Sequence, residues 1–131
     1  ADFALDYGRE ARRLREIFHL DDEMPWRFDE LSHGERKKLQ VAVALWQRPD
    51  ALVLDEPTNH IDHEAREELA QALRSFTGVG ILVSHDRDLL DALADRCISF
   101  EAGKLIGRPG GYTAAHAQAE RERTANQTAK A

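Results

Sequence analysis

Apolar residues recur at intervals of three and four in several segments of the chain, which is the spacing of one face of an α-helix. This pattern predicts helices over Tyr7–Leu20, Glu35–Gln47 and His63–Phe76. A shorter helix is expected over Asp88–Ala94. Asp86 is its expected N-cap residue, because a short carboxylate side chain can accept hydrogen bonds from the first free amides of a helix.

Two short runs lack polar side chains apart from one closing acid: Ala51–Asp55, which ends in that acid, and Val79–Val83. Such runs are typical of strands that are buried on both faces of a parallel sheet. Two further strands are predicted over Cys97–Phe100 and Lys104–Gly107, joined by a hairpin turn at residues 102–103. The alternation of helices and strands therefore predicts an α/β fold, in which right-handed crossover helices connect the strands of a parallel sheet.

Composition limits the classes of function. The chain has 131 residues, of which 42% are hydrophobic and 32% charged, and this balance is ordinary for a soluble globular protein. No run approaches the roughly 20 apolar residues of a membrane-spanning helix, and residues 1–10 do not resemble a secretory signal.

Cys97 is the single cysteine, which excludes a disulfide within the chain and agrees with a cytoplasmic location. The formal charge of −6 is unfavourable for general nucleic-acid binding, and the basic clusters Arg9–Arg15 and Arg36–Lys38 are interpreted as solvated helix faces.

A short loop, Leu31–Glu35, precedes the second predicted helix. Ser32 and Gly34 could present a hydroxyl and backbone N–H groups at the positive end of that helix, which would make an anion site. The same residues also fit a capping box between Ser32 and Glu35, and taken alone the loop favours that structural interpretation.

Two acids, Asp55 and Glu56, end the first buried strand. Ligands of open α/β sheets bind outside the carboxyl ends of strands, where Asp55 could bind Mg²⁺ and Glu56 could polarise a water for attack on a phosphoryl group. The alternative is a pair of surface acids in a turn. The second strand ends similarly in Ser84-His85-Asp86. His85 could contact a γ-phosphate or orient the attacking water there, or it could stand by chance beside a capping Ser or Asp residue.

Taken in order, these motifs resemble those of ATP-binding-cassette (ABC) ATPases. Leu31–Glu35 resembles the signature motif, Leu52–Glu56 the Walker B strand with its catalytic glutamate, Thr58–Asp62 the D-loop region, and His85 the switch histidine. The run from Asp55 to Asp62 is most similar to the ABC-F subfamily, whose members have two cassettes and no membrane domain. Gly111-Tyr112 and the Ala-rich segment after it are similar to the start of the ABC-F linker.

The resemblance implies a partial P-loop NTPase-type ABC domain. Residues 1–48 would be the end of the helical subdomain, 49–111 the C-terminal part of the ATPase core, and 112–131 a helical extension or linker start. It also implies ATP and Mg²⁺ as ligands, a second cassette as partner, and action on the ribosome. Asp55 would bind Mg²⁺, and Glu56 and His85 would act at the same site. Ser32, Gly34 and Glu35 would serve the opposite site, and Asp62 would contact the partner cassette.

The sequence departs from the family pattern in important places. It contains no Gly-x-x-x-x-Gly-Lys-Ser/Thr phosphate loop and no recognisable glutamine loop, and its single Gly-Lys pair, Gly103-Lys104, lies in the predicted hairpin. The chain is therefore expected to be a fragment that is inactive alone and leaves apolar sheet surface exposed. His33 stands where the family more often has Gly. Alternative functions are an ABC transporter subunit, because many cassettes power transport, and a non-catalytic interaction module, which would also lack the phosphate loop.

Other conspicuous residues have structural interpretations. His60 and His63 have a His-x-x-His spacing, but no nearby Cys or third His completes a metal site. Cys97 is interpreted as a small core residue, and Trp26 and Trp46 as packing residues.

Overall fold

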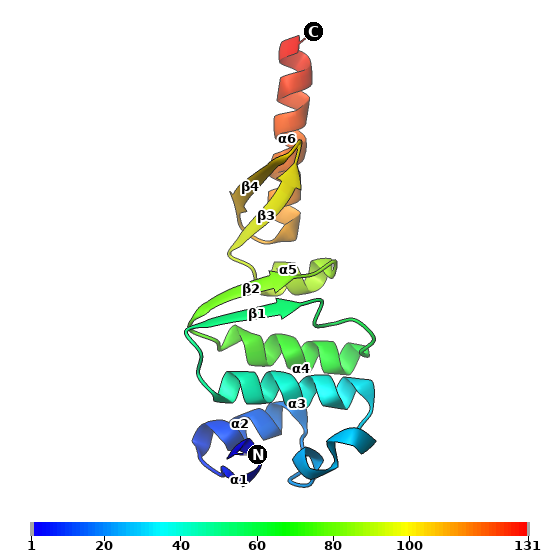
Figure 1. Cartoon of the computed structure of the whole chain (residues 1–131). Helices are drawn as coiled ribbons and strands as arrows, with labels where there is room; N and C mark the ends of the chain where they lie inside the picture. The colour runs from blue at the N-terminus through cyan, green and yellow to red at the C-terminus, as the bar shows by residue number, and fades with distance from the viewer. Residues whose placement is uncertain (1, 131) are drawn as a thin grey trace. The chain divides into compact units, whose positions relative to one another are not determined.

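The computed structural model describes residues 2–130, and it divides into two compact units, one up to Val83 and one from Ser84 onward. Each unit is described by itself below. Figure 1 shows the elements of both along the chain.

The first unit contains four α-helices, a 3₁₀-helix and two strands. They are α1 (Asp2–Leu5), α2 (Arg9–Phe18), η1 (Met24–Glu30), α3 (His33–Trp46), β1 (Ala51–Asp55), α4 (His63–Arg74) and β2 (Val79–Val83). The strands β1 and β2 pair in parallel, from Ala51 opposite Val79 to Asp55 opposite Val83, and α4 connects them. This crossover unit confirms the α/β fold predicted from the sequence, and the observed bounds lie within two residues of most predicted ones.

The hydrophobic core of the first unit lies between the helices. Leu14 and Phe18 of α2 and Leu69 of α4 are fully buried, and residues of α3 complete the cluster. The helices α3 and α4 lie on the same side of the two strands (Figure 1). Trp46 packs against this core, with its ring 5.7 Å from that of Phe3, and its indole Nε1 donates to Asp6 Oδ2 at 2.6 Å. The prediction of a packing role is therefore confirmed for Trp46.

The two strands are buried on one face, whereas the sequence predicted burial on both. Leu52 and Leu54 point toward the helical core, but Val53 is 64% exposed and Ile81 is 54% exposed. Side chains alternate between the faces of a strand, so one layer of helices covers every second residue. An all-apolar run cannot reveal which of its faces a particular chain covers. The expected exposure of apolar sheet surface is confirmed.

Trp26 is 63% exposed, so the interpretation of this residue as a packing residue is wrong. It lies in η1, a 3₁₀-helix that the sequence pattern did not predict. Met24 and Phe28 of η1 pack against the core, and the winding of this short helix leaves the Trp26 ring outside.

The second unit consists of α5 (Arg87–Leu93), β3 (Arg96–Glu101), β4 (Lys104–Pro109) and α6 (Tyr112–Lys130). The strands β3 and β4 form an antiparallel hairpin that pairs Glu101 with Lys104. Ala102 and Gly103 have φ values of 50° and 79°, as a tight hairpin turn requires. The predicted hairpin is confirmed, and the helix expected after Tyr112 is α6.

The start of α6 packs within this unit. Ala115 and Ala119 are buried, and Thr113 donates from both its backbone N and its Oγ1 to the carboxylate of Asp91 on α5. Arg108 of β4 is only 4% exposed and donates to Glu101 at 2.5 Å and to Glu122 of α6 at 2.7 Å. This ion-pair network joins α6 to the hairpin.

Hydrogen bonds lower the pKa of Glu101 from 4.5 to about 2; those from Arg108 have the largest effect and that from Ser99 the next largest. Because the pKa is lower in the folded state, the stabilisation is fully present above about pH 4.5 and is lost as the pH falls toward about 2. We expect the Glu101 carboxyl carbon to titrate near pH 2 by NMR in the wild-type protein, and at a clearly higher pH in Arg108→Met, where the Ser99 hydrogen bond remains. Titration of wild-type Glu101 near its ordinary pKa would contradict this network.

Candidate functional site

One end of the first unit gathers most of the motifs singled out in the sequence. The carboxyl ends of β1 and β2 and the N-termini of α3 and α4 lie at this end (Figure 1). Lys37 Nζ donates to the Glu56 carbonyl at 3.3 Å, which joins α3 to the loop after β1. The rings of His33 and His60 meet edge to face with their centroids 5.8 Å apart, which joins the same two segments again.

The loop before α3 forms the capping box that the sequence suggested. Ser32 is the N-cap residue, and its Oγ accepts from the Glu35 backbone N at 3.2 Å. The Ser32 backbone N donates to Glu35 Oε1 at 3.0 Å. This hydrogen bond is the larger cause of a lowered pKa of the Glu35 carboxyl, and a hydrogen bond from the Ser32 side chain is the second cause. The Ser32 hydroxyl therefore interacts with Glu35 both as an acceptor from its backbone N and as a donor to its carboxylate, so an anion at this helix N-terminus would have to replace the second contact or use the first backbone N–H groups of the helix.

Gly34 lies in the first turn of α3, and the fold does not require a glycine there. A Cβ at this position would meet Ile61 Cγ2 at 3.7 Å, which is an ordinary van der Waals contact. The backbone φ of Gly34 is not in the left-handed region. The absence of a side chain at Gly34 thus leaves space at the helix N-terminus without any benefit to packing. His33, beside it, is exposed and packs against His60.

Asp55 and Glu56 lie where the sequence placed them, at the carboxyl end of β1. Asp55 is exposed and Glu56 is half-buried. Glu56 has a φ of 48°, a left-handed conformation that costs a residue other than glycine about 1–3 kcal/mol. Such strain persists only where surrounding contacts impose it, and it is frequent at active sites.

Asp62 begins α4 as its N-cap residue. Its Oδ1 accepts from the Ala65 backbone N at 2.8 Å, and the side chain is exposed. Its expected contact with a partner cassette stays a prediction.

His85 belongs to the second unit, so its expected place beside Glu56 stays a prediction as well. It is exposed, and its neighbours form the turn that begins α5. The Asp86 backbone N donates to Ser84 Oγ at 2.9 Å, and Asp86 Oδ1 accepts from the Leu89 backbone N at 3.2 Å. The expected cap at Asp86 is confirmed.

The basic clusters are only in part the solvated helix faces that the sequence suggested, because Arg9 and Arg12 are exposed but two other arginines reach backbone carbonyls. Arg15 is buried and donates to the carbonyls of Phe3 and Asp6. Arg36 donates to the carbonyls of Phe28 and Asp29. Long cationic side chains can bury their stems and reach carbonyls distant in sequence, and spacing along the chain carries no signal of such contacts.

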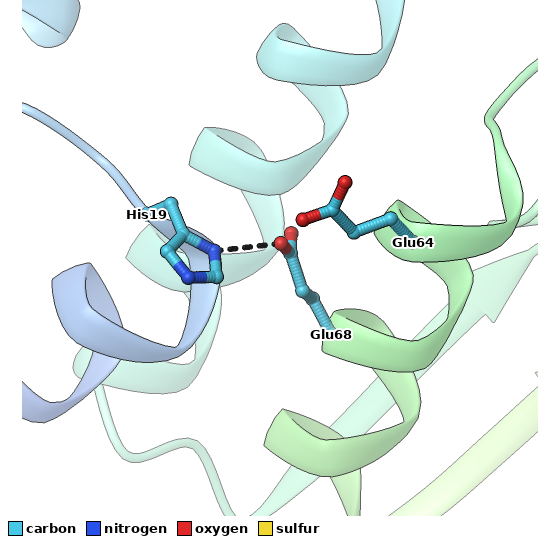
Figure 2. A group of neighbouring side chains, drawn as sticks. All are labelled: His19, Glu64 and Glu68. Carbon is cyan, nitrogen blue, oxygen red and sulfur yellow. Dashed lines mark hydrogen bonds and ion pairs between the residues drawn. The ribbon is translucent and has the colours of Figure 1, made fainter.

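Figure 2 shows His19, at the end of α2, directed toward Glu64 and Glu68 of α4. Donor atoms of these three residues lie within 4.8 Å of one another, which is the separation that a metal site could use. However, Lys38 Nζ lies 2.6 Å from Glu68 Oε2, and His19 Nδ1 lies 2.7 Å from Glu68 Oε1. Both oxygens of the buried Glu68 already have cationic or hydrogen-bonding neighbours, so we interpret the group as a link between α2, α3 and α4.

Cys97 is half-buried, and burial raises the pKa of its thiol above the ordinary value. A raised pKa disfavours the thiolate, which agrees with the structural interpretation of this cysteine.

Comparison with known proteins decides the family. A family model described as "AAA domain, putative AbiEii toxin, Type IV TA system" matches residues 4–92. The chain belongs to this AAA domain family. Its relatives are ABC-F-type ATP-binding proteins, which confirms the resemblance found in the sequence.

Two relatives illustrate the similarity of this AAA-family chain. It is 37% identical over 103 residues to the ATP-binding protein Uup of Buchnera aphidicola subsp. Schizaphis graminum (strain Sg), covering 79% of this chain and 17% of Uup. It is 42% identical over 103 residues to the ribosome protection protein VmlR of Bacillus subtilis (strain 168), covering 78% of this chain and 18% of VmlR. The chain thus spans less than a fifth of the length of the relatives it matches.

Solved structures share the fold. A structure of RNase-L inhibitor matches with a TM-score of 0.64 and 28% identity, covering 82% of this chain and 22% of that chain. A dimeric ATP-binding cassette, solved in a post-hydrolysis state with ADP and Pi, matches with a TM-score of 0.61 and 21% identity, covering 77% and 46%. The AAA-family chain therefore has part of the fold of an ABC ATPase domain. Within residues 2–130, no helix is long and apolar enough to cross a membrane.

The residues at the end of the first unit fit part of a Mg²⁺–ATP complex. Asp55 offers an exposed carboxylate, and Mg²⁺ is commonly bound by one or two carboxylates together with substrate phosphates. The space at Gly34 suits the close approach of a phosphate to the N-terminus of α3. The sequence contains no Gly-x-x-x-x-Gly-Lys-Ser/Thr loop of the kind that cradles nucleotide phosphates.

Proposed function

We propose that this chain is the C-terminal part of an ABC-F ATPase cassette and that it contributes to ATP hydrolysis in the intact protein. The observation that carries the proposal is the gathering of the signature-like loop and the acidic end of β1 at one end of the first unit (Figure 1). The ABC-F-type relatives support the same assignment.

In this proposal the residues divide between two sites. Asp55 holds Mg²⁺, which supplies positive charge to the reacting phosphoryl group. Glu56 orients the attacking water and accepts its proton, and His85 contacts the γ-phosphate of the same nucleotide. Ser32, Gly34 and the capping Glu35 present the N-terminus of α3 to the nucleotide of the opposite cassette.

The proposed partner is a second cassette, which Asp62 contacts across the interface. Closure of the two cassettes would assemble each site from both halves. We further propose that the intact protein acts in the cytoplasm on the ribosome, and the name of VmlR as a ribosome protection protein supports this choice.

Hydrolysis assays on the intact protein and on the 131-residue chain test the proposal. We expect Mg²⁺-dependent ATP hydrolysis by the intact protein and none by the chain alone, because the chain has no loop to hold the phosphates. Co-sedimentation with ribosomes should increase when the intact protein is locked with ATP. An intact protein that neither hydrolyses ATP nor binds it would overturn the proposed function, whereas hydrolysis without ribosome binding would overturn the proposed target.

A further inference from the structure

The backbone of Glu56 is held by contacts from three segments. Its N–H donates to the Val83 carbonyl at the end of β2 at 2.7 Å. Its carbonyl accepts from the Asn59 backbone N at 3.3 Å and from Lys37 Nζ at 3.3 Å. The contact from Lys37 differs from the other two because it comes from a side chain on another element, α3.

These contacts matter because Glu56 has a left-handed φ of 48°. The direction of the Cα–Cβ bond follows from the backbone, so relaxation of this φ to a negative value would redirect the carboxylate. A group that orients a water must be held within about 0.5 Å of its productive position. A contact that fixes the Glu56 peptide therefore also fixes where its carboxylate can act.

Lys37 suits this role better than its neighbour does. Its side chain is half-buried, and its ammonium donates to the Glu56 carbonyl. Lys38, the next residue of α3, instead pairs with the buried Glu68. The two lysines of one helix thus serve different parts of the unit.

We propose that Lys37 is a positioning residue that holds the Glu56 peptide. It thereby links α3, whose N-cap is Ser32, to the carboxylate of Glu56 in the same cassette. This inference rests on the proposed function. The consequence is that the two nucleotide sites are coupled. A nucleotide of the opposite site that binds the N-terminus of α3 would also stabilise, through Lys37, the position of Glu56 in its own site.

The test compares Lys37→Met, Lys37→Arg and Lys104→Met in the intact protein. Lys104 is an exposed lysine at the start of β4, so Lys104→Met removes the same charge and leaves the contact between Lys37 and Glu56 in place. We expect Lys37→Met to lower kcat about five- to tenfold with little change in the KM for ATP, since the Asn59 contact remains. Lys37→Arg should restore kcat to within about twofold, because a guanidinium also donates to a carbonyl. Lys104→Met should be unchanged.

Amide hydrogen exchange in the same proteins separates this inference from the proposed function. Lys37→Met should speed the exchange of the Glu56 and Asn59 amides, while the amides of the α2–α4 core remain protected and show that the variant folds. An unchanged kcat in Lys37→Met, an equal loss in Lys37→Arg, or a loss that appears only in KM overturns the positioning role. A Glu56→Gln variant as active as wild type would overturn the proposed function. Unchanged exchange of the Glu56 and Asn59 amides in Lys37→Met would overturn the positioning role, whatever the activity of Glu56→Gln.

Discussion

Glu56→Gln is expected to lower ATP hydrolysis by the intact protein about 10²- to 10⁴-fold, which is the usual contribution of a general base. Glutamine has nearly the same shape as glutamate, but its amide cannot accept a proton from water. The backbone contacts of Glu56 with Val83, Asn59 and Lys37 involve no side-chain atom of Glu56, so they should persist. The variant should therefore fold, bind ATP and hold the cassettes closed.

The measurement pairs steady-state hydrolysis with binding of a fluorescent ATP analogue. Glu67→Gln is the matched control, because Glu67 is an exposed glutamate on α4 with no place in the proposed site. The control should hydrolyse ATP at the wild-type rate. Undiminished hydrolysis in Glu56→Gln would remove Glu56 from the mechanism, and loss of ATP binding would indicate a structural role instead.

Gly34→Ala is expected to preserve or raise stability while it lowers hydrolysis at least about tenfold. Alanine favours a helix over glycine by up to about 1 kcal/mol, and the added Cβ would make only an ordinary contact with Ile61. The same methyl group would occupy the space through which a phosphate must approach the first amides of α3. A change that stabilises the fold and impairs the reaction separates the function of Gly34 from its packing.

The control for Gly34→Ala is Gln40→Ala, an exposed substitution farther along the same helix. Chemical denaturation should show both variants folded with urea midpoints at or above that of wild type, and only Gly34→Ala should hydrolyse ATP slowly. Wild-type hydrolysis in Gly34→Ala would mean that no phosphate approaches this helix end closely. A clear loss of stability would mean that the space around Gly34 has a structural purpose.

The elements of the fold could be predicted from local patterns because each of those patterns has a local physical cause. The helical spacing of apolar residues predicted α2, α3 and α4, and the apolar runs predicted β1 and β2. The exposure of Val53 and Ile81 could not be predicted, since the same apolar run serves a strand covered on one face or on both. Trp26 was misjudged because a large aromatic side chain is usually buried, and its exposure depends on the winding of η1.

The site was predicted only as far as its residues are adjacent in sequence. The capping box at Ser32 and the acids Asp55 and Glu56 follow from short motifs with a local mechanism. The contact of Lys37 with Glu56 and the burial of Arg108 depend on how distant segments meet. No spacing rule identifies such pairs, so the sequence could not distinguish these residues from ordinary surface cations.

In the proposed function, Glu56 acts on a nucleotide of its own cassette while the N-terminus of α3 serves the nucleotide of the opposite cassette. A structure of the intact Glu56→Gln protein with Mg²⁺ and ATP measures this directly. We expect two ATP molecules between the cassettes. One γ-phosphate should lie beside the glutamine side chain that replaces Glu56 and beside the first turn of the signature helix of the other cassette. The second should lie beside the first turn of α3 and beside the residue of the other cassette that corresponds to Glu56. ATP bound with Ser32 and Gly34 far from any phosphate would contradict it.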